Sequence, residues 1–156
     1  MQSKNKKNSV LYFTYGSNMS TKRLRERVPA AQPVGIAILQ DYEFKCSKKS
    51  KDGSSKGNIS PQKDALTWGV VFKIPDSTLP ILDEAEGGYR RITVRVSMGG
   101  QNIECETYIS EKISTELPYD WYMKYIVDGS REHGLPNDYV RALSQIPVKE
   151  DKRKRQ

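Results

Sequence analysis

The 156-residue sequence contains one histidine and two cysteines, so it has few of the side chains that usually bind transition metals. Cys46 and Cys105 are far apart in the chain and do not form the close pairs typical of zinc sites. The histidine, His133, lies in a polar segment at the end of a predicted helix. We therefore expect no histidine-based metal site, two buried thiols and a helix-terminal histidine.

Several other signatures are also missing. The sequence has no Walker loop, no G-x-S-x-G motif and no G-x-G-x-x-G motif. No apolar run approaches the roughly 18 residues that a membrane-spanning helix needs. The basic start, MQSKNKKNSV, is not followed by the apolar segment and small-residue cleavage site of a secretory signal. With reduced cysteines, these absences predict a cytoplasmic protein that does not interact with membranes.

The net charge of +7 is concentrated in three short segments. Residues 1–9, 46–57 and 149–156 each carry a net charge of +3, so the rest of the chain is slightly acidic. Nucleic-acid-binding surfaces usually add aromatic side chains to such charge, and these segments contain none. We interpret them as flexible basic tails at residues 1–9 and 148–156 and a flexible loop, and expect no nucleic-acid partner. Weak contact with a polyanion is the alternative.

The apolar pattern predicts one α+β domain over residues 10–147. Strands are expected at residues 9–14, 34–44, 58–61, 66–74, 89–98 and 103–110, and helices at residues 20–29, 76–87, 119–134 and 137–146. Residues 47–57 are expected to be a loop. This order, with a hairpin turn at Gly99–Gly100, predicts a small mixed β-barrel or a strongly curved sheet with flanking helices.

A first candidate site is the segment YGSN at residues 15–18, where a predicted strand ends and a short helix follows. The first N–H groups of a helix have no intrahelical partner and can bind a carboxylate. Gly16 would let a ligand approach the backbone closely. The alternative is an ordinary turn in which Ser17 or Asn18 caps the helix.

A second candidate site is the acidic segment that contains Asp83, Glu84 and Glu86 and is followed by two glycines. In a helix, Glu86 lies one turn after Leu82 and can face inward while Asp83 or Glu84 stays in water. Partial removal from water raises the pKa of a carboxyl group, which makes it a candidate general base. The alternative is a solvated helix end that the two following arginines neutralise.

Four segments together resemble the γ-glutamylcyclotransferases, which have an AIG2-like fold. They are YFTYGSN, WGVVFKI, LDEAEG followed by YRR, and GLPNDYVRALSQI, in the family's order between Val10 and Ile146. The resemblance implies a small mixed β-barrel with flanking helices that releases 5-oxoproline from a γ-glutamyl amine without a metal or cofactor. The GLP segment and Asn18 resemble the branch that acts on γ-glutamyl amino acids more than the glutathione-specific branch.

Carried over by motif, the resemblance implies that Glu86 is the general acid and base. It implies substrate-binding roles for Tyr12, Phe13, Thr14, Tyr15, Gly16, Ser17, Asn18, Tyr89 and Tyr122. This agrees with the chemistry, because the α-amine of the substrate attacks its own γ-carbonyl and the reaction is intramolecular. One carboxylate can take a proton from that amine and return it to the leaving amine, while backbone N–H groups hold the α-carboxylate or the oxyanion.

The loop between Glu86 and Tyr89 is shorter than is common in the family. A shorter loop changes the side of the pocket where the leaving amine lies, so the sequence leaves the substrate open. Other γ-glutamyl-acylated amines, including ε-(γ-glutamyl)-lysine and acylated antibiotic intermediates, are alternatives. A non-catalytic protein that binds small carboxylates and a nucleic-acid binder that uses the basic tails are two further hypotheses. The oligomeric state is also open, with a homodimer among the alternatives.

Overall fold

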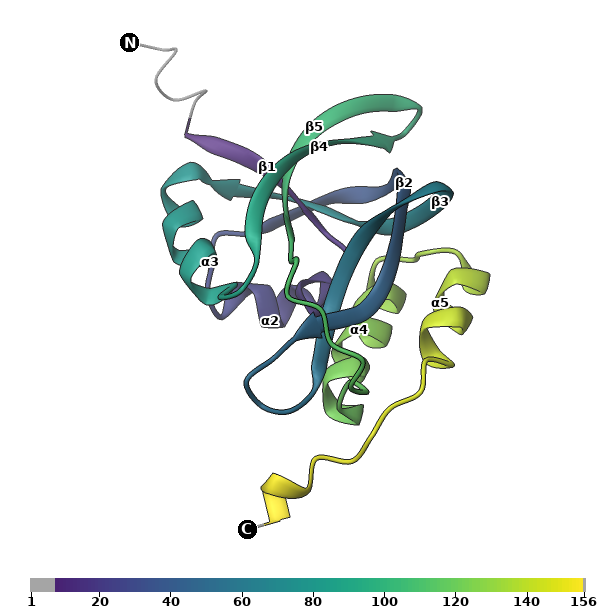
Figure 1. The fold of residues 1–156 in the computed structure, drawn as a ribbon. Helices are drawn as coiled ribbons and strands as arrows, with labels where there is room; N and C mark the ends of the chain where they lie inside the picture. Colours follow the sequence, from purple (N-terminus) through teal and green to yellow (C-terminus); the bar gives the residue numbers. More distant parts are fainter. Residues whose placement is uncertain (1–7, 156) are drawn as a thin grey trace.

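The computed structural model describes residues 8–155 and shows a closed five-stranded β-barrel with helices packed beside it (Figure 1). In chain order the elements are β1 (Ser9–Thr14), η1 (Ser17–Met19), α2 (Thr21–Arg25), β2 (Gln32–Lys49), β3 (Ser55–Pro75), η2 (Asp76–Thr78), α3 (Leu79–Ala85), β4 (Arg90–Met98), β5 (Gln101–Ile109), α4 (Asp120–Glu132), α5 (Asn137–Ser144) and η3 (Lys152–Arg155). The predicted α+β class and mixed β-barrel are confirmed. No helix in this part of the chain is long and apolar enough to cross a membrane.

The barrel is mixed because one of its strand pairs is parallel. The order of neighbouring strands is β1-β3-β2-β4-β5. The barrel closes where β5 pairs in parallel with β1, at Tyr12 and Glu106. The other neighbours are antiparallel, with β2 and β4 joined at Ile38 and Ser97. Closure therefore places the end of β1 beside β5 as well as β3.

The segment WGVVFKI is apolar except for the exposed Lys73, because both faces of β3 are buried along most of it. Val71 packs with Phe13 in a cluster made of strand residues, inside the barrel. Val70 and Phe72 point the other way, into a second cluster shared with α3, α4 and α5. Alternate residues of a strand face opposite sides, so a strand between two apolar layers needs no polar face.

The prediction of a flexible loop at residues 47–57 is wrong. β2 continues to Lys49, β3 begins at Ser55, and Lys48 pairs directly with Lys56 across the hairpin. Asp52 stabilises the turn between them, because its Oδ1 accepts hydrogen bonds from the Ser54 N–H at 3.0 Å and hydroxyl at 2.6 Å. Backbone pairing and this side-chain contact, rather than apolar burial, order the segment, so no hydrophobic pattern marks it. The two strands expected at residues 58–61 and 66–74 are likewise one continuous strand.

The division into one domain and two tails stays a prediction. The lysines of the predicted N-terminal tail, Lys4, Lys6 and Lys7, lie outside the described residues. In the predicted C-terminal tail, the Lys149 N–H donates to the Pro118 carbonyl at 2.9 Å. Asp151 is buried and accepts a hydrogen bond from Trp121 Nε1 at 2.8 Å. At least part of that segment therefore packs against α4 and the chain before it.

Candidate active site

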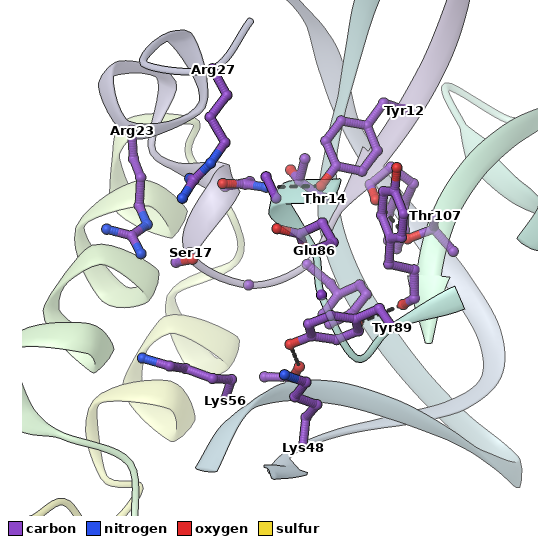
Figure 2. Close-up of a pocket in the computed structure, with 18 of the residues that line it drawn as sticks. Tyr12, Thr14, Ser17, Arg23, Arg27, Lys48, Lys56, Glu86, Tyr89 and Thr107 are labelled. Carbon is purple, nitrogen blue, oxygen red and sulfur yellow. Dashed lines mark hydrogen bonds between the residues drawn. The ribbon is translucent and has the colours of Figure 1, made fainter. Parts of the chain in front are cut away.

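A cavity of about 240 Å³ opens where β1 ends, between the barrel, α3 and α4 (Figure 2). Every site residue predicted from the sequence lines it: Tyr12, Phe13, Thr14, Tyr15, Gly16, Ser17, Asn18, Glu86, Tyr89 and Tyr122. The structure thus brings the end of β1, the end of α3, the start of β4 and α4 into one place.

One wall of the cavity is the turn from β1 into η1. The buried Asn18 side chain donates from Nδ2 to the Tyr12 hydroxyl at 2.9 Å, which fastens the turn to the strand. The Tyr15 hydroxyl donates to the Tyr108 carbonyl at 2.6 Å and ties the same turn to β5. Because Ser17 begins η1, its N–H and that of Asn18 are in the position where a helix leaves N–H groups without intrahelical partners.

Glu86 enters the cavity from the end of α3, where its backbone N–H donates to the Leu82 carbonyl at 2.8 Å. Figure 2 shows its side chain in the middle of the labelled residues. Burial raises the pKa of Glu86, while the positive charges of Arg27, Lys48 and Arg23 oppose this rise. A partly desolvated carboxylate is a stronger base than a glutamate in water, which suits it to taking up a proton and returning it.

The other acidic residues of the segment LDEAEG do not enter the cavity. Asp83 and Glu84 are exposed, as expected. Asp83 accepts a hydrogen bond from the Tyr108 hydroxyl at 2.6 Å and pairs with Arg91 at 3.2 Å. Asp83 is therefore an acidic group at a helix end that an arginine neutralises, as one of the two interpretations of this segment expected. Glu86 instead points into the cavity.

Two tyrosines hold the backbone of Gly57 on the far side of the cavity. The Gly57 N–H donates to the Tyr122 hydroxyl at 2.8 Å, and the Tyr89 hydroxyl donates to the Gly57 carbonyl at 2.5 Å. Burial raises the pKa of both tyrosines well above the ordinary range, so both are neutral at physiological pH. They fix the β2–β3 hairpin to β4 and α4.

The cavity also contains positive charges that were not predicted from the sequence; they belong to Arg23, Arg27, Lys48 and Lys56. With Glu86 as the carboxylate in the lining, these charges favour an anionic ligand. The two lysines come from the segment that was expected to be a flexible loop. One feature of the sequence could have predicted this hairpin, because the pair Asp52–Gly53 is a typical hairpin turn sequence. The residues on either side of it are polar, however, and lack the alternating apolar pattern of most hairpins. Ser50, Gly57, Ala85, Gly87, Thr107 and Tyr108 complete the lining.

The cysteines and the histidine lie outside the cavity lining. Cys46 and Cys105 are free thiols, and burial raises the pKa of each to about 12. His133 caps the end of α4, with a ring nitrogen 2.9 Å from the Met19 carbonyl oxygen. Among residues 8–155, no group of three or more His, Cys, Asp or Glu side chains could hold a metal.

Comparison with known proteins relates most of the chain to one group of enzymes. The model of the AIG2-like family matches residues 67–143. The chain is 35% identical to the γ-glutamylcyclotransferase of Mus musculus, covering 94% of this chain and 83% of the relative. It is 37% identical to the γ-glutamylcyclotransferase of Homo sapiens, covering 88% and 79%. A solved γ-glutamyl cyclotransferase structure matches with a TM-score of 0.86 at 33% identity, over 90% of this chain and 89% of that chain.

Proposed function

This chain belongs to the γ-glutamylcyclotransferase family and is an enzyme of that type, and we propose that Glu86 is the residue that transfers protons in its reaction. The reaction releases 5-oxoproline and a free amino acid or amine from a small γ-glutamyl substrate. The observation that carries the proposal is the position of Glu86, a carboxylate with a raised pKa in the same cavity as the Gly16–Asn18 turn.

The reaction begins with the γ-glutamyl group held at the turn after β1. The α-amine of the substrate is mostly protonated at neutral pH and loses a proton to Glu86. Its nitrogen then attacks the γ-carbonyl carbon, and the new C–N bond closes a five-membered ring. Because nucleophile and carbonyl belong to one molecule, holding the chain curled lowers the barrier by several kcal/mol.

The second half of the reaction breaks the original amide. Backbone N–H groups of the Gly16–Asn18 turn stabilise the oxyanion that forms at the γ-carbonyl. When the carbonyl re-forms, the bond to the leaving nitrogen breaks and that nitrogen takes the proton from Glu86. The ring nitrogen still carries a second proton, which passes through the regenerated carboxylate to the released amine, so that the amine leaves as an ammonium ion. No water is consumed, and one acidic residue serves all of these proton transfers.

We also propose that the protein acts in the cytoplasm on small molecules. Its two free thiols fit a reducing compartment. Two of the lysines that make residues 46–57 basic line the cavity, so their charges serve a small-molecule site rather than an exposed surface for nucleic acid.

The test is 5-oxoproline formation from a panel of γ-glutamyl amines, measured for the wild type, Glu86→Gln and Glu84→Gln. We expect Glu86→Gln to lose about 10²- to 10⁴-fold in kcat/KM, because the general acid and base is gone. Glu84 is exposed on the same helix, so its variant should behave like the wild type. Full activity in a folded Glu86→Gln variant would show that the assignment is wrong. Stabilisation by 5-oxoproline without turnover of any substrate would favour a non-catalytic binding protein instead.

A further inference from the structure

Lys48 is a buried cation in the cavity that forms no close ion pair with any carboxylate of residues 8–155. Its side chain lines the cavity, and the residue is only 9% exposed. The ammonium lies over the Tyr89 ring, 5.0 Å from the ring centroid. The negative charge of Glu86 attracts the Lys48 ammonium, but the two groups are not in contact. Within the described chain no acidic side chain lies within 4.0 Å of this ammonium. Because burial of an unpaired ammonium is unfavourable, the position is suited to a ligand that supplies the missing anion.

The other three cations of the cavity either have a counter-ion or lie elsewhere in it. Lys56 already has a counter-ion, since its ammonium lies 3.2 Å from Asp52 Oδ2. Arg23 and Arg27 follow the Gly16–Asn18 turn in the chain and lie next to it, where the γ-glutamyl group is proposed to bind. Lys48 is therefore the cation left for another part of the substrate.

Figure 2 places Lys48 beside Tyr89, on the opposite side of Glu86 from Arg27. A substrate that binds its γ-glutamyl end at the turn and its scissile amide near Glu86 directs its leaving group toward Lys48. The cavity thus has cations on both sides of its acid and base. A γ-glutamyl amino acid has the matching charges, with one carboxylate at each end and the amide between them.

The short loop after Glu86 is what gives Lys48 access to this position. Gly88 has a φ of +88°, and a Cβ atom added there would lie 2.9 Å from both Cε and Nζ of Lys48. The Ser110 hydroxyl donates to the Gly88 carbonyl at 2.7 Å and holds the loop in place. The Lys48 side chain therefore occupies space that a side chain at position 88 would need.

We propose that Lys48 determines specificity for the leaving group by binding a carboxylate on the amine that is released. An α-amino acid leaving group has such a carboxylate next to the scissile amide, whereas a simple alkylamine has none for Lys48 to bind. This inference rests on the proposed function, because it assigns the leaving-group side of the same cavity.

The test compares γ-glutamylalanine with γ-glutamyl ethylamide, which lacks only the carboxylate of the leaving group. We expect Lys48→Met to lower kcat/KM for γ-glutamylalanine by about 10- to 100-fold, the usual effect of losing a charge-assisted hydrogen bond. The value for the ethylamide should change little. The two leaving amines differ in basicity, which changes the absolute rates. Each substrate is therefore compared with itself in the wild type and in Lys48→Met, and the two changes in kcat/KM are then compared with each other. Lys48→Arg should restore part of the preference, because it keeps the positive charge.

The matched control is Lys49→Met, since Lys49 is the exposed neighbour of Lys48 on β2 and does not line the cavity. It should leave both kcat/KM values unchanged. Equal losses for both substrates in Lys48→Met, or no loss for either, would overturn the inference while the proposed function stands.

If the wild type turns over neither compound, the wider panel of γ-glutamyl amines decides the proposed function, and calorimetric binding of the same two compounds tests Lys48 separately. A carboxylate preference in binding that disappears in Lys48→Met would support the inference. A preference that persists, or no binding of either compound, would overturn it.

Discussion

The Tyr122 hydroxyl on α4 accepts a hydrogen bond from the backbone N–H of Gly57 at 2.8 Å, and so joins the last third of the chain to the β2–β3 hairpin inside the cavity. The carbonyl of the same glycine accepts from Tyr89 at 2.5 Å. An added Cβ at Gly57 would lie 3.0 Å from the Phe44 ring, so the site is tightly packed. The hairpin that carries Lys48 and Lys56 is therefore positioned by two tyrosines from other elements.

Tyr122→Phe should lower both stability and activity. The variant leaves the buried Gly57 N–H without its acceptor, which costs about 1–3 kcal/mol in the free energy of unfolding. Urea unfolding and 5-oxoproline formation measure the two effects. The control is Tyr125→Phe, one turn along α4 with a side chain 38% exposed, and it should change neither quantity. A Tyr122→Phe variant as stable as the control would contradict a structural role for this hydrogen bond.

Glu86→Gln should be more stable than the wild type at neutral pH. Burial raises the pKa of Glu86, so the folded state binds this proton more tightly than the unfolded state does. The wild type therefore loses stability as the pH rises from the ordinary glutamate range through the raised pKa. Glutamine does not ionise, so the variant has no such loss.

Urea unfolding of both proteins from about pH 4 to about pH 8 checks this expectation, since unperturbed glutamate titrates near the lower limit. The two proteins should be equally stable at the acidic end and diverge as the pH rises. Glu84→Gln, at an exposed position, should follow the wild type throughout. A stability difference for Glu86→Gln that does not vary with pH would argue against a raised pKa.

Gly129→Ala should destabilise the protein, although alanine favours helices. A Cβ at Gly129 would lie 2.6 Å from the Ser20 backbone nitrogen and 2.8 Å from the Met19 carbonyl carbon. Pushing α4 away from η1 costs about 1–3 kcal/mol, more than the roughly 1 kcal/mol gained in helix propensity. Because η1 carries Asn18, 5-oxoproline formation should fall as well.

Urea unfolding gives the sign of the Gly129→Ala effect directly. Asp128→Ala, at the exposed neighbouring position on α4, is the control and should stay within about 0.5 kcal/mol of the wild type. A Gly129→Ala variant more stable than the wild type would mean that α4 and η1 are not in close contact.

Alkylation of the cysteines should not affect activity at neutral pH. Only the thiolate reacts readily, and burial raises the pKa of Cys46 and Cys105 to about 12. Incubation with iodoacetamide at about pH 7.5 should leave both the mass and the rate of 5-oxoproline formation unchanged. The double variant Cys46→Ser and Cys105→Ser should be active too. Rapid inactivation that the double variant escapes would indicate an accessible thiolate near the site.

Local patterns correctly predicted much of the fold. The strand at residues 9–14, the hairpin around Gly99–Gly100 and the helix of α4 each have a periodicity or turn sequence of their own. The helix after Ser20 begins as expected, since the Ser20 hydroxyl accepts from the Arg23 N–H at 3.2 Å, but it ends at Arg25 rather than near Pro29. The β2–β3 hairpin was missed because pairing between polar strands leaves no apolar alternation in the sequence.

The sequence by itself determined the family, and it predicted the turn at Gly16–Asn18 and the carboxylate of Glu86 as parts of the site. Each of these depends on neighbouring residues or on the order of short motifs. Only the tertiary structure decided what surrounds them. Barrel closure through the parallel pair of β1 and β5, and the hairpin that places Lys48 in the cavity, depend on contacts between distant segments. A lysine looks the same in a sequence whether water or protein surrounds it. Its burial, and so its use as a binding group, depends on the packing of the whole chain.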